Sequence, residues 1–330
     1  MNRSAAFVLI GTLAVVLSAC VASGGGLGPV PSAVPTPSGS PAGPDLTPVP
    51  GESADPSTSP TPTPGSSGSP SPTASPAPTA APGSGNTIVR AYFVLGGEPR
   101  SEGLVPVLRE VPETTGIARA AMNALLSGPT ASESGERTVT SAIPDGSRLL
   151  GIDIKNGIAT VDLSTEFDSG GGSASMQYRL AQVVYTLTQF STVKSVVFQI
   201  EGTTVTVFGS EGIVLAGPVG RGDFTDQLPS IFVDRPAYGA ALGNPGRVTG
   251  SANVFEAAFL ISLLDAKGRI LVDEPVMALC GTGCRGGFDV TLRYTVGKAQ
   301  WGILRTYNLS AKDGSVEDVR EYPVWLTPAG

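Results

Sequence analysis

The side chains of this chain that can do chemistry are its cysteines and a small group of carboxylates. The sequence has 330 residues, three cysteines and no histidine. Nucleophilic serine and cysteine are commonly activated by a histidine base, so Ser–His and Cys–His pairs are excluded. The candidates that remain are Cys20, Cys280 and Cys284, and the carboxylates of Asp162, Glu166 and Asp168.

Clustered carboxylates can transfer protons or bind calcium, and this group fits neither role well. An acid–base pair needs one member whose pKa is raised by burial, yet Asp162 alternates outward between Val161 and Leu163. Glu166 and Asp168 fall in a Ser/Gly-rich stretch that does not match a D-x-D-x-D-G calcium loop. We interpret the group as the solvated end of a strand, with an ion site and catalysis as the alternatives.

Two short motifs suggest enzymes, but their surroundings argue against both. Ser191–Lys194 fits the S-x-x-K pattern of penicillin-binding enzymes, which also require S-D-N and K-T-G elements that do not occur here. Gly281–Gly286 fits the G-x-G-x-x-G dinucleotide fingerprint, which requires a helix after the loop. The sequence GFDVTLRY that follows is typical of a strand. We therefore predict no catalytic residue, no cofactor and no metal ligand from these patterns.

Cys20 ends a short apolar run near the start of the chain. The run Ala5–Val16 has 12 residues and follows Arg3, so it is shorter than the about 20 apolar residues that span a bilayer. A positive start, a short apolar core and small residues are typical of a secretory signal peptide. Leu17–Cys20 (LSAC) resembles the lipobox of bacterial lipoproteins, which implies that Cys20 is lipidated and becomes the first residue after cleavage. The alternative is an ordinary signal peptide.

Residues 1–20 are therefore predicted to be a lipoprotein signal peptide, and the protein to be extracytoplasmic, held on the bacterial cell membrane by Cys20. Residues 21–86 contain 17 of the 29 prolines, three acids and no lysine, arginine or aromatic residue. Such a segment cannot bury enough apolar surface to fold, so we predict a disordered linker. The formal net charge of −7 is a poor match for nucleic acid, which is not expected as a partner.

Residues 87–222 are predicted to form an α+β domain. Runs rich in β-branched and aromatic residues at Thr87–Leu95 and Leu104–Val111 indicate strands, and Asn156-Gly157 between alternating runs indicates a hairpin. Apolar residues at helical spacing predict two helices; they are Ile117, Ala121, Ala124 and Leu125, then Met176, Leu180, Val183, Leu187 and Phe190. The order ββα-ββα-ββ predicts two helices on one face of an antiparallel-rich sheet.

Three segments of this region resemble the GerMN domain, the sporulation and spore germination module. They are MNALLSGP (Met122–Pro129), VDLSTEF (Val161–Phe167) and YTLTQFSTVKSVVFQIEG (Tyr185–Gly202). The resemblance implies an extracytoplasmic module that is often carried by lipoproteins. It brings no catalytic residue to this sequence.

Residues 229–328 are predicted to form an all-β, immunoglobulin-like sandwich. Phe288–Val296 alternates strictly between apolar and polar residues, as a half-buried antiparallel strand does. Val248–Phe255, Ala257–Val272 (turning at Asp265–Gly268) and Tyr322–Leu326 continue the pattern of short strands and turns. The segments IFVDRP, NPGRVTGSANVFEAAF, GGFDVTL and LSAKDGSVEDVREYPVWL resemble the immunoglobulin-like domain of bacterial spore germination.

Cys280 and Cys284 form the sequence CGTGC between two predicted strands of the sandwich. Outside the cytoplasm such a pair is best interpreted as a disulfide that closes a small loop. The alternatives are two free thiols or half of a metal site. Zinc would need two carboxylates to complete its four ligands, because there is no histidine and no second cysteine pair.

The sequence as a whole suggests a non-enzymatic, lipid-anchored envelope protein that presents two binding or structural modules outside the membrane. A role in sporulation, germination or envelope assembly is expected, with the membrane and envelope proteins or peptidoglycan as partners. The alternative is a protein that binds or acts on cell-wall glycans through carboxylates and exposed aromatic rings. Of the two tryptophans, Trp301 and Trp325, the second alternates with Tyr322–Val324 in a strand, which favours a core position.

Overall fold

The structure is a computed structural model that describes residues 85–97, 100–135 and 139–329. Both predicted domains lie within one compact unit, residues 73–330. The predicted signal peptide, Cys20 and all but the last two residues of the predicted linker lie outside the described residues. Within the described ranges, no helix has the length and apolar character needed to cross a membrane.

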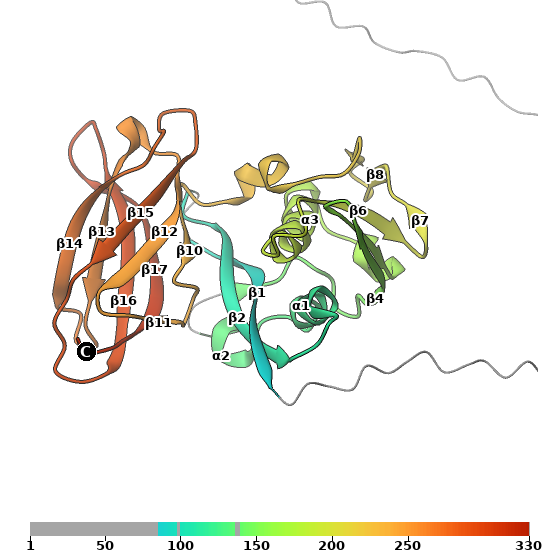
Figure 1. Cartoon of the computed structure of the whole chain (residues 1–330). Coiled ribbons are helices and arrows are strands. Elements are labelled where there is room, and N and C mark those ends of the chain that lie inside the picture. Colours follow the sequence, from blue (N-terminus) through green and yellow to red (C-terminus); the bar gives the residue numbers. More distant parts are fainter. Residues whose placement is uncertain (1–84, 98–99, 136–138, 330) are drawn as a thin grey trace, which may run out of the picture. The chain divides into compact units, whose positions relative to one another are not determined.

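The first domain consists of two separate sheets with helices between them (Figure 1). The first sheet has the order β2-β1-β3 and comprises β1 (Asn86–Leu95), β2 (Gly103–Pro112) and β3 (Val139–Thr140). The second has the order β4-β5-β6-β7 and comprises β4 (Leu149–Lys155), β5 (Ile158–Leu163), β6 (Ser195–Ile200) and β7 (Thr203–Thr204). The helices are α1 (Ile117–Leu126), α2 (Ala131–Ser134) and α3 (Ser173–Leu187), and a small hairpin contains β8 (Val207–Phe208) and β9 (Ile213–Val214).

The α+β class of this domain is confirmed, and its local signals have clear physical causes. The β4–β5 hairpin turns at Asn156 and Gly157, whose φ values of 52° and 84° are those that this residue pair tolerates best. On α3, the predicted apolar positions from Met176 to Leu187 are fully buried, so this face supplies much of the core. Phe190 lies beyond the end of the helix.

The expectation of a single sheet is wrong, because side chains of α3 and of the turn that follows it occupy the edge of β1 where a further strand would pair. The Gln189 side-chain amide accepts from the Arg90 N–H at 2.8 Å and donates to the Arg90 carbonyl at 2.7 Å. Thr186 Oγ1 accepts from the Tyr92 N–H at 3.1 Å, and Gln182 Nε2 donates to the Tyr92 carbonyl at 2.9 Å. These bonds satisfy the main chain of β1 without a strand. β5 instead pairs with β6, in parallel across the α3 crossover.

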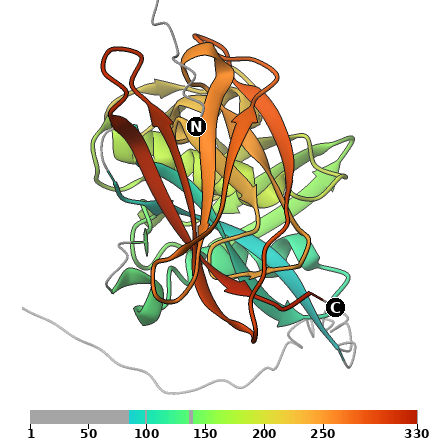
Figure 2. The ribbon, with the colours of Figure 1, turned by 90° about the vertical axis from the view of Figure 1, so that its left-hand side faces the viewer.

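The second domain is the predicted all-β sandwich of two sheets, seen in Figure 2 with its orange and red strands in front. The smaller sheet has the order β10-β12-β15 and comprises β10 (Ile231–Arg235), β12 (Gly246–Ala252) and β15 (Gly286–Leu292). The larger has the order β11-β17-β16-β13-β14 and comprises β11 (Ala241–Leu242), β13 (Ala258–Leu264), β14 (Ile270–Met277), β16 (Gln300–Leu309) and β17 (Val316–Leu326). Short 3₁₀ helices occur in both domains and between them. They are η1 (Thr165–Asp168) in the first domain, η2 (Arg221–Gln227) before β10, and η3 (Phe255–Ala257) between β12 and β13.

The alternation in β15 places its apolar side chains in the sandwich core, as predicted. Phe288 and Leu292 are buried, whereas Asp289 and Thr291 are exposed. The Phe288 ring packs edge-on against Phe259 of β13 in the other sheet, with 4.9 Å between ring centroids. This contact across the two sheets is the kind that stabilises a sandwich core.

One apolar core runs through both domains. The ring of Phe232 on β10 packs edge-on against Tyr185 of α3, with 6.2 Å between centroids. The Tyr238 N–H donates to the Pro106 carbonyl of β2 at 2.8 Å. The two modules thus share an apolar contact and main-chain bonds, where a chain of independent domains would have a flexible linker.

Candidate functional site

Arg320 of β17 forms hydrogen bonds across the junction between the domains. It is a buried arginine that is 3% exposed. Its Nη2 donates to the carbonyls of Gly103 at 3.1 Å and Leu104 at 3.0 Å, and its Nη1 donates to the carbonyl of Ser101. The guanidinium also lies over the Tyr322 ring, 5.4 Å from its centroid. One side chain of the sandwich therefore satisfies three carbonyls of the first domain.

A second polar cluster joins β10 to β1. The Tyr92 hydroxyl donates to Asp234 Oδ1 at 2.6 Å, and Arg90 Nη1 lies 3.4 Å from Asp234 Oδ2. Arg221 Nη2 donates to the Tyr92 hydroxyl oxygen at 3.3 Å, and its guanidinium lies 4.6 Å from the centre of the Tyr185 ring. Burial, and after it the charge of Asp234, raises the pKa of Tyr92 from 10.0 to about 12. The cluster joins the two domains by hydrogen bonds, and Tyr92 stays protonated in it.

Beside this junction the surface is hollowed into an open groove of about 980 Å³. Its walls come from both domains: Arg100 and Glu102 before β2, Tyr178 of α3, Asp226 of η2, and the loop Thr282–Arg285. A groove between two domains with charged and aromatic walls is a common place for a ligand. We take this groove as the candidate functional site.

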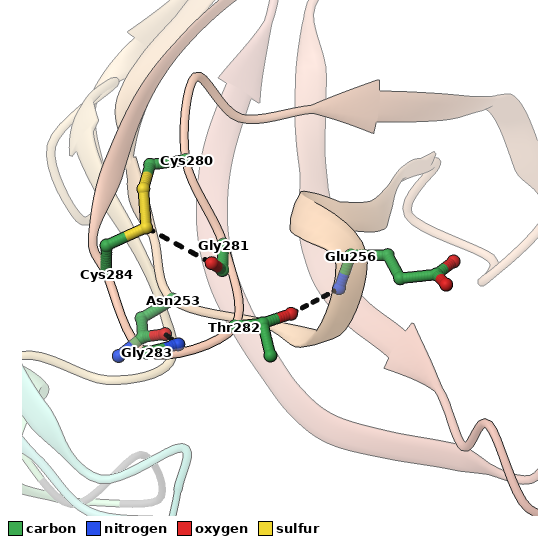
Figure 3. Close-up of a disulfide and its surroundings, with 7 residues drawn as sticks. All are labelled: Asn253, Glu256, Cys280, Gly281, Thr282, Gly283 and Cys284. Atoms are coloured by element: carbon green, nitrogen blue, oxygen red, sulfur yellow. Dashed lines mark hydrogen bonds between the residues drawn. A yellow bond between two sulfur atoms is a disulfide. The ribbon is translucent and has the colours of Figure 1, made fainter.

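The loop that forms one wall of the groove is closed by the Cys280–Cys284 disulfide, whose Cα atoms lie 5.8 Å apart (Figure 3). The Thr282 N–H donates to the Val254 carbonyl at 2.9 Å, and Thr282 Oγ1 accepts from the Glu256 N–H at 2.9 Å. The disulfide loop is thereby bonded to the segment that contains η3.

Breaking this disulfide should have a small effect on stability, because the closed loop is short. The chain-entropy relation gives about 2 kcal/mol for a loop of this size. We expect Cys280→Ser combined with Cys284→Ser to lower the free energy of unfolding by at most about 2 kcal/mol in a urea titration. A larger loss would mean that the loop supports the sandwich core itself.

Arg285, at the end of the loop, is a half-buried cation in the groove wall. Its Nη2 donates to the Pro229 carbonyl at 2.8 Å, and its Nη1 donates to the Ser251 carbonyl at 3.2 Å. Burial lowers the pKa of Arg285, an effect that the charge of Asp226 opposes in part. The guanidinium is thus held by carbonyl dipoles, and it forms no ion pair with a carboxylate in the part of the chain that the structure describes.

Of the three carboxylates singled out in the sequence, two accept hydrogen bonds from turns of the first domain and the third lies near an arginine. Asp162 Oδ1 accepts from the Gly202 N–H at 2.8 Å, and Asp168 Oδ1 accepts from the Gly209 N–H at 2.8 Å. Glu166 Oε1 lies 3.5 Å from an Arg148 guanidinium nitrogen. Each has its own partner, and no set of three or more potential metal ligands gathers anywhere in the described ranges.

The two enzyme-like motifs occupy the local structures that the sequence predicts. Ser191–Lys194 forms the turn between α3 and β6, where the Lys194 N–H donates to the Gly157 carbonyl at 2.7 Å. Gly281–Gly286 leads directly into strand β15. Neither segment opens a helix, so neither has the geometry that its motif requires.

The expectation that Trp325 lies in the core is wrong. Tyr322 and Val324 are buried, but Trp325 lies on the opposite face of β17 and is 36% exposed. It pairs across the strands with Trp301 of β16, which is 52% exposed, and the ring centroids are 5.3 Å apart. Strand alternation places Trp325 on the solvent side, because residues one apart point to opposite faces.

The sequence pattern did not identify three residues of the junction, Arg320, Asp234 and Arg285. Of these, only Arg320 could have been recognised from the pattern. Arg320 shares the inward face of β17 with Tyr322 and Val324, so an arginine at an apolar position was visible in the sequence. Asp234 and Arg285 have no such signal, because their partners are distant in the sequence.

Comparisons with known protein families match both domains. Residues 90–206 match the family described as sporulation and spore germination. Residues 230–315 match the family described as the immunoglobulin-like domain of bacterial spore germination. A search of curated proteins found no significant match.

Several solved structures are similar to parts of the chain. The first GerMN domain of the sporulation protein GerM from Bacillus subtilis is 24% identical, with 42% of this chain and 99% of that chain covered and a TM-score of 0.36. The tandem GerMN domains of the same protein are 15% identical, with 74% and 62% covered and a TM-score of 0.36. A putative lipoprotein from Clostridium perfringens is 20% identical, with 46% and 97% covered and a TM-score of 0.31.

The family matches agree with the order of domains in the structure, an α+β domain followed by an all-β sandwich. Together they cover more than half of the chain. The chain therefore carries a domain of the sporulation and spore germination family followed by an immunoglobulin-like domain of bacterial spore germination.

Proposed function

We propose that this protein is a non-enzymatic envelope lipoprotein of sporulation or germination, anchored through Cys20 and presenting its two domains outside the membrane as a single binding body. The observation that carries the proposal is the junction, where two spore germination domains share one core and form a groove. A groove built from both domains gives the pair a binding surface that neither domain has alone. Envelope proteins or peptidoglycan are the proposed partners.

The non-enzymatic part of the proposal is supported by the roles of the candidate catalytic side chains. Asp162 and Asp168 accept hydrogen bonds from turn N–H groups. Lys194 ends a turn that leads into strand β6. These contacts give the three residues a structural role. Histidine, the commonest general base, is absent from the sequence.

The anchoring part of the proposal rests on the segment LSAC and is tested by substitution of Cys20. We expect the full-length wild-type protein, expressed in a bacterial host with lipoprotein processing, to enter the detergent phase of a Triton X-114 partition. Cys20→Ala should move it to the aqueous phase, because the acyl chains supply the membrane affinity.

Ser18→Ala is the matched control for this partition, because it keeps a small residue two positions before the cysteine. It should leave the protein in the detergent phase. Detergent partition of the Cys20→Ala protein would refute the lipid anchor, and aqueous partition of wild type and variant alike would indicate an ordinary, cleaved signal peptide.

A further inference from the structure

Phe255 is an exposed aromatic residue held on an unusual backbone. Its side chain is 55% exposed at one wall of the groove. The next two residues, Glu256 and Ala257, both have positive φ values, 53° and 59°. Two consecutive non-glycine residues in the left-handed region cost free energy, and such strain persists where the surrounding structure enforces it.

The disulfide loop enforces this conformation. Thr282 bonds to both sides of Phe255. Its N–H donates to the Val254 carbonyl at 2.9 Å, and its Oγ1 accepts from the Glu256 N–H at 2.9 Å, a bond that Figure 3 shows. Gly281 packs so closely on the segment that a side-chain Cβ there would lie 2.7 Å from the Ala257 Cβ. Phe255 is therefore presented to solvent by a pre-organised turn, which reduces the entropy lost when a partner binds it.

Phe255 also separates two hollows of different character. On one side lies the groove with its charged walls, and on the other an open hollow of about 540 Å³. The second hollow is lined by Leu260, Pro275, Met277 and Leu309, of which Met277 is 72% and Leu309 is 49% exposed. An apolar hollow of this size accepts a large aliphatic or aromatic side chain.

The groove carries charged side chains of both signs that are not neutralised by a direct ion pair. Glu102 and Asp226 form no ion pair with a described residue, and neither does Arg285. The negative charge of Glu102 contributes to the raised pKa of Tyr178, after the larger effect of burial. A ligand that complements this wall carries cationic and anionic groups within a short distance.

We propose that Phe255 is the centre of a binding site for an extended segment of a partner protein. The segment inserts one large apolar side chain into the hollow beside Met277 and lays charged residues of both signs along the groove. A polypeptide supplies an apolar anchor and both charges in one chain, whereas a neutral glycan lacks the charges. The inference rests on the proposed function, because it names the partner class of the same two-domain body.

A selection from a random peptide library displayed on phage, against the immobilised full-length chain, tests the proposal. We expect enriched peptides to share one large apolar residue flanked by acidic and basic residues. Phe255→Ala should weaken the binding of a selected synthetic peptide about tenfold or more, because truncating a central aromatic anchor removes most of its contact energy. The melting temperature should be unchanged, since the Phe255 side chain is exposed.

Trp301→Ala is the matched control, because Trp301 is an equally exposed aromatic residue on the outer face of the same sandwich. It should leave peptide binding unchanged. The proposal is overturned if no peptides are enriched, or if the selected peptides bind the Phe255→Ala protein as tightly as wild type. Displacement of the peptides by soluble cell-wall fragments would also overturn it, in favour of a glycan. Failure of the Cys20 anchor would leave this binding result intact, so the two proposals fail separately.

Discussion

Arg320→Ala is expected to lower the free energy of unfolding by about 3 kcal/mol or more. The change leaves the carbonyls of Ser101, Gly103 and Leu104 without their donor at the junction of the two domains. An unsatisfied buried polar group costs roughly 1–3 kcal/mol, and water entering the space recovers part of that cost. The alkyl part of the side chain, which packs at the Tyr322 ring, is lost as well. Urea unfolding followed by tryptophan fluorescence measures the loss.

Arg247→Ala is the control for this experiment. Arg247 belongs to the same domain and is bonded to Asp289, but both side chains are well exposed. Exposed ion pairs contribute about 1 kcal/mol or less, so this variant should remain close to wild type. Equal losses in the two variants would contradict the role assigned to Arg320. Separate unfolding transitions for the two domains in the Arg320→Ala protein would show that the domains have become uncoupled.

Tyr92 is expected to make the folded state lose stability as the pH rises from about 10 to 12. Burial and the charge of Asp234 raise the pKa of Tyr92 from 10.0 to about 12, so the folded state holds this proton more tightly than the unfolded state. The contribution is complete below pH 10 and is lost as the pH rises toward 12. A shift of this size corresponds to about 3 kcal/mol. Tyr92→Phe should abolish this part of the alkaline loss.

The Tyr92 prediction is tested by urea titrations of wild type and Tyr92→Phe at several values between pH 8 and pH 12, a window that brackets the shift. Burial also raises the pKa of Tyr185 and Tyr322, so the difference between the proteins is the relevant quantity. Tyr92→Phe should cost about 1–2 kcal/mol at pH 8, because the bond to Asp234 is lost. Tyr307→Phe, which alters a partly exposed tyrosine that donates to Asp273, is the control. Parallel pH curves for wild type and Tyr92→Phe would refute the prediction.

The features of the fold that were predictable depend on residues close together in the sequence. The hairpin at Asn156-Gly157, the alternation in β15 and the apolar face of α3 are each fixed by local spacing. Local spacing also excludes the two enzyme motifs, since each depends on a helix that the adjacent residues do not form.

The features that were not predictable depend on side chains meeting across large sequence separations. The division into two sheets follows from Gln182, Thr186 and Gln189, which bond the main chain of β1. The three residues have helical spacing in the sequence, although Gln189 lies just beyond the end of α3, so the polar pattern was visible but the strand that it bonds was not. The groove likewise needs both domains in place, and only the tertiary contacts bring Phe255 and Asp226 to one hollow.

Arg179, Arg285 and Arg320 are among the arginines that donate to main-chain carbonyl oxygens. A carbonyl oxygen is present whichever side chain a residue carries. Substitutions at Ser101 or Leu104 therefore leave the carbonyl acceptors of Arg320 in place, although both side chains are themselves buried. The exception is Gly103, with a φ of 155°, where an added Cβ would lie 2.6 Å from Pro229 Cδ. The hydrogen bonds of Arg320 thus depend on one arginine side chain and on the absence of a side chain at Gly103, and not on the identity of the other residues that supply the acceptors.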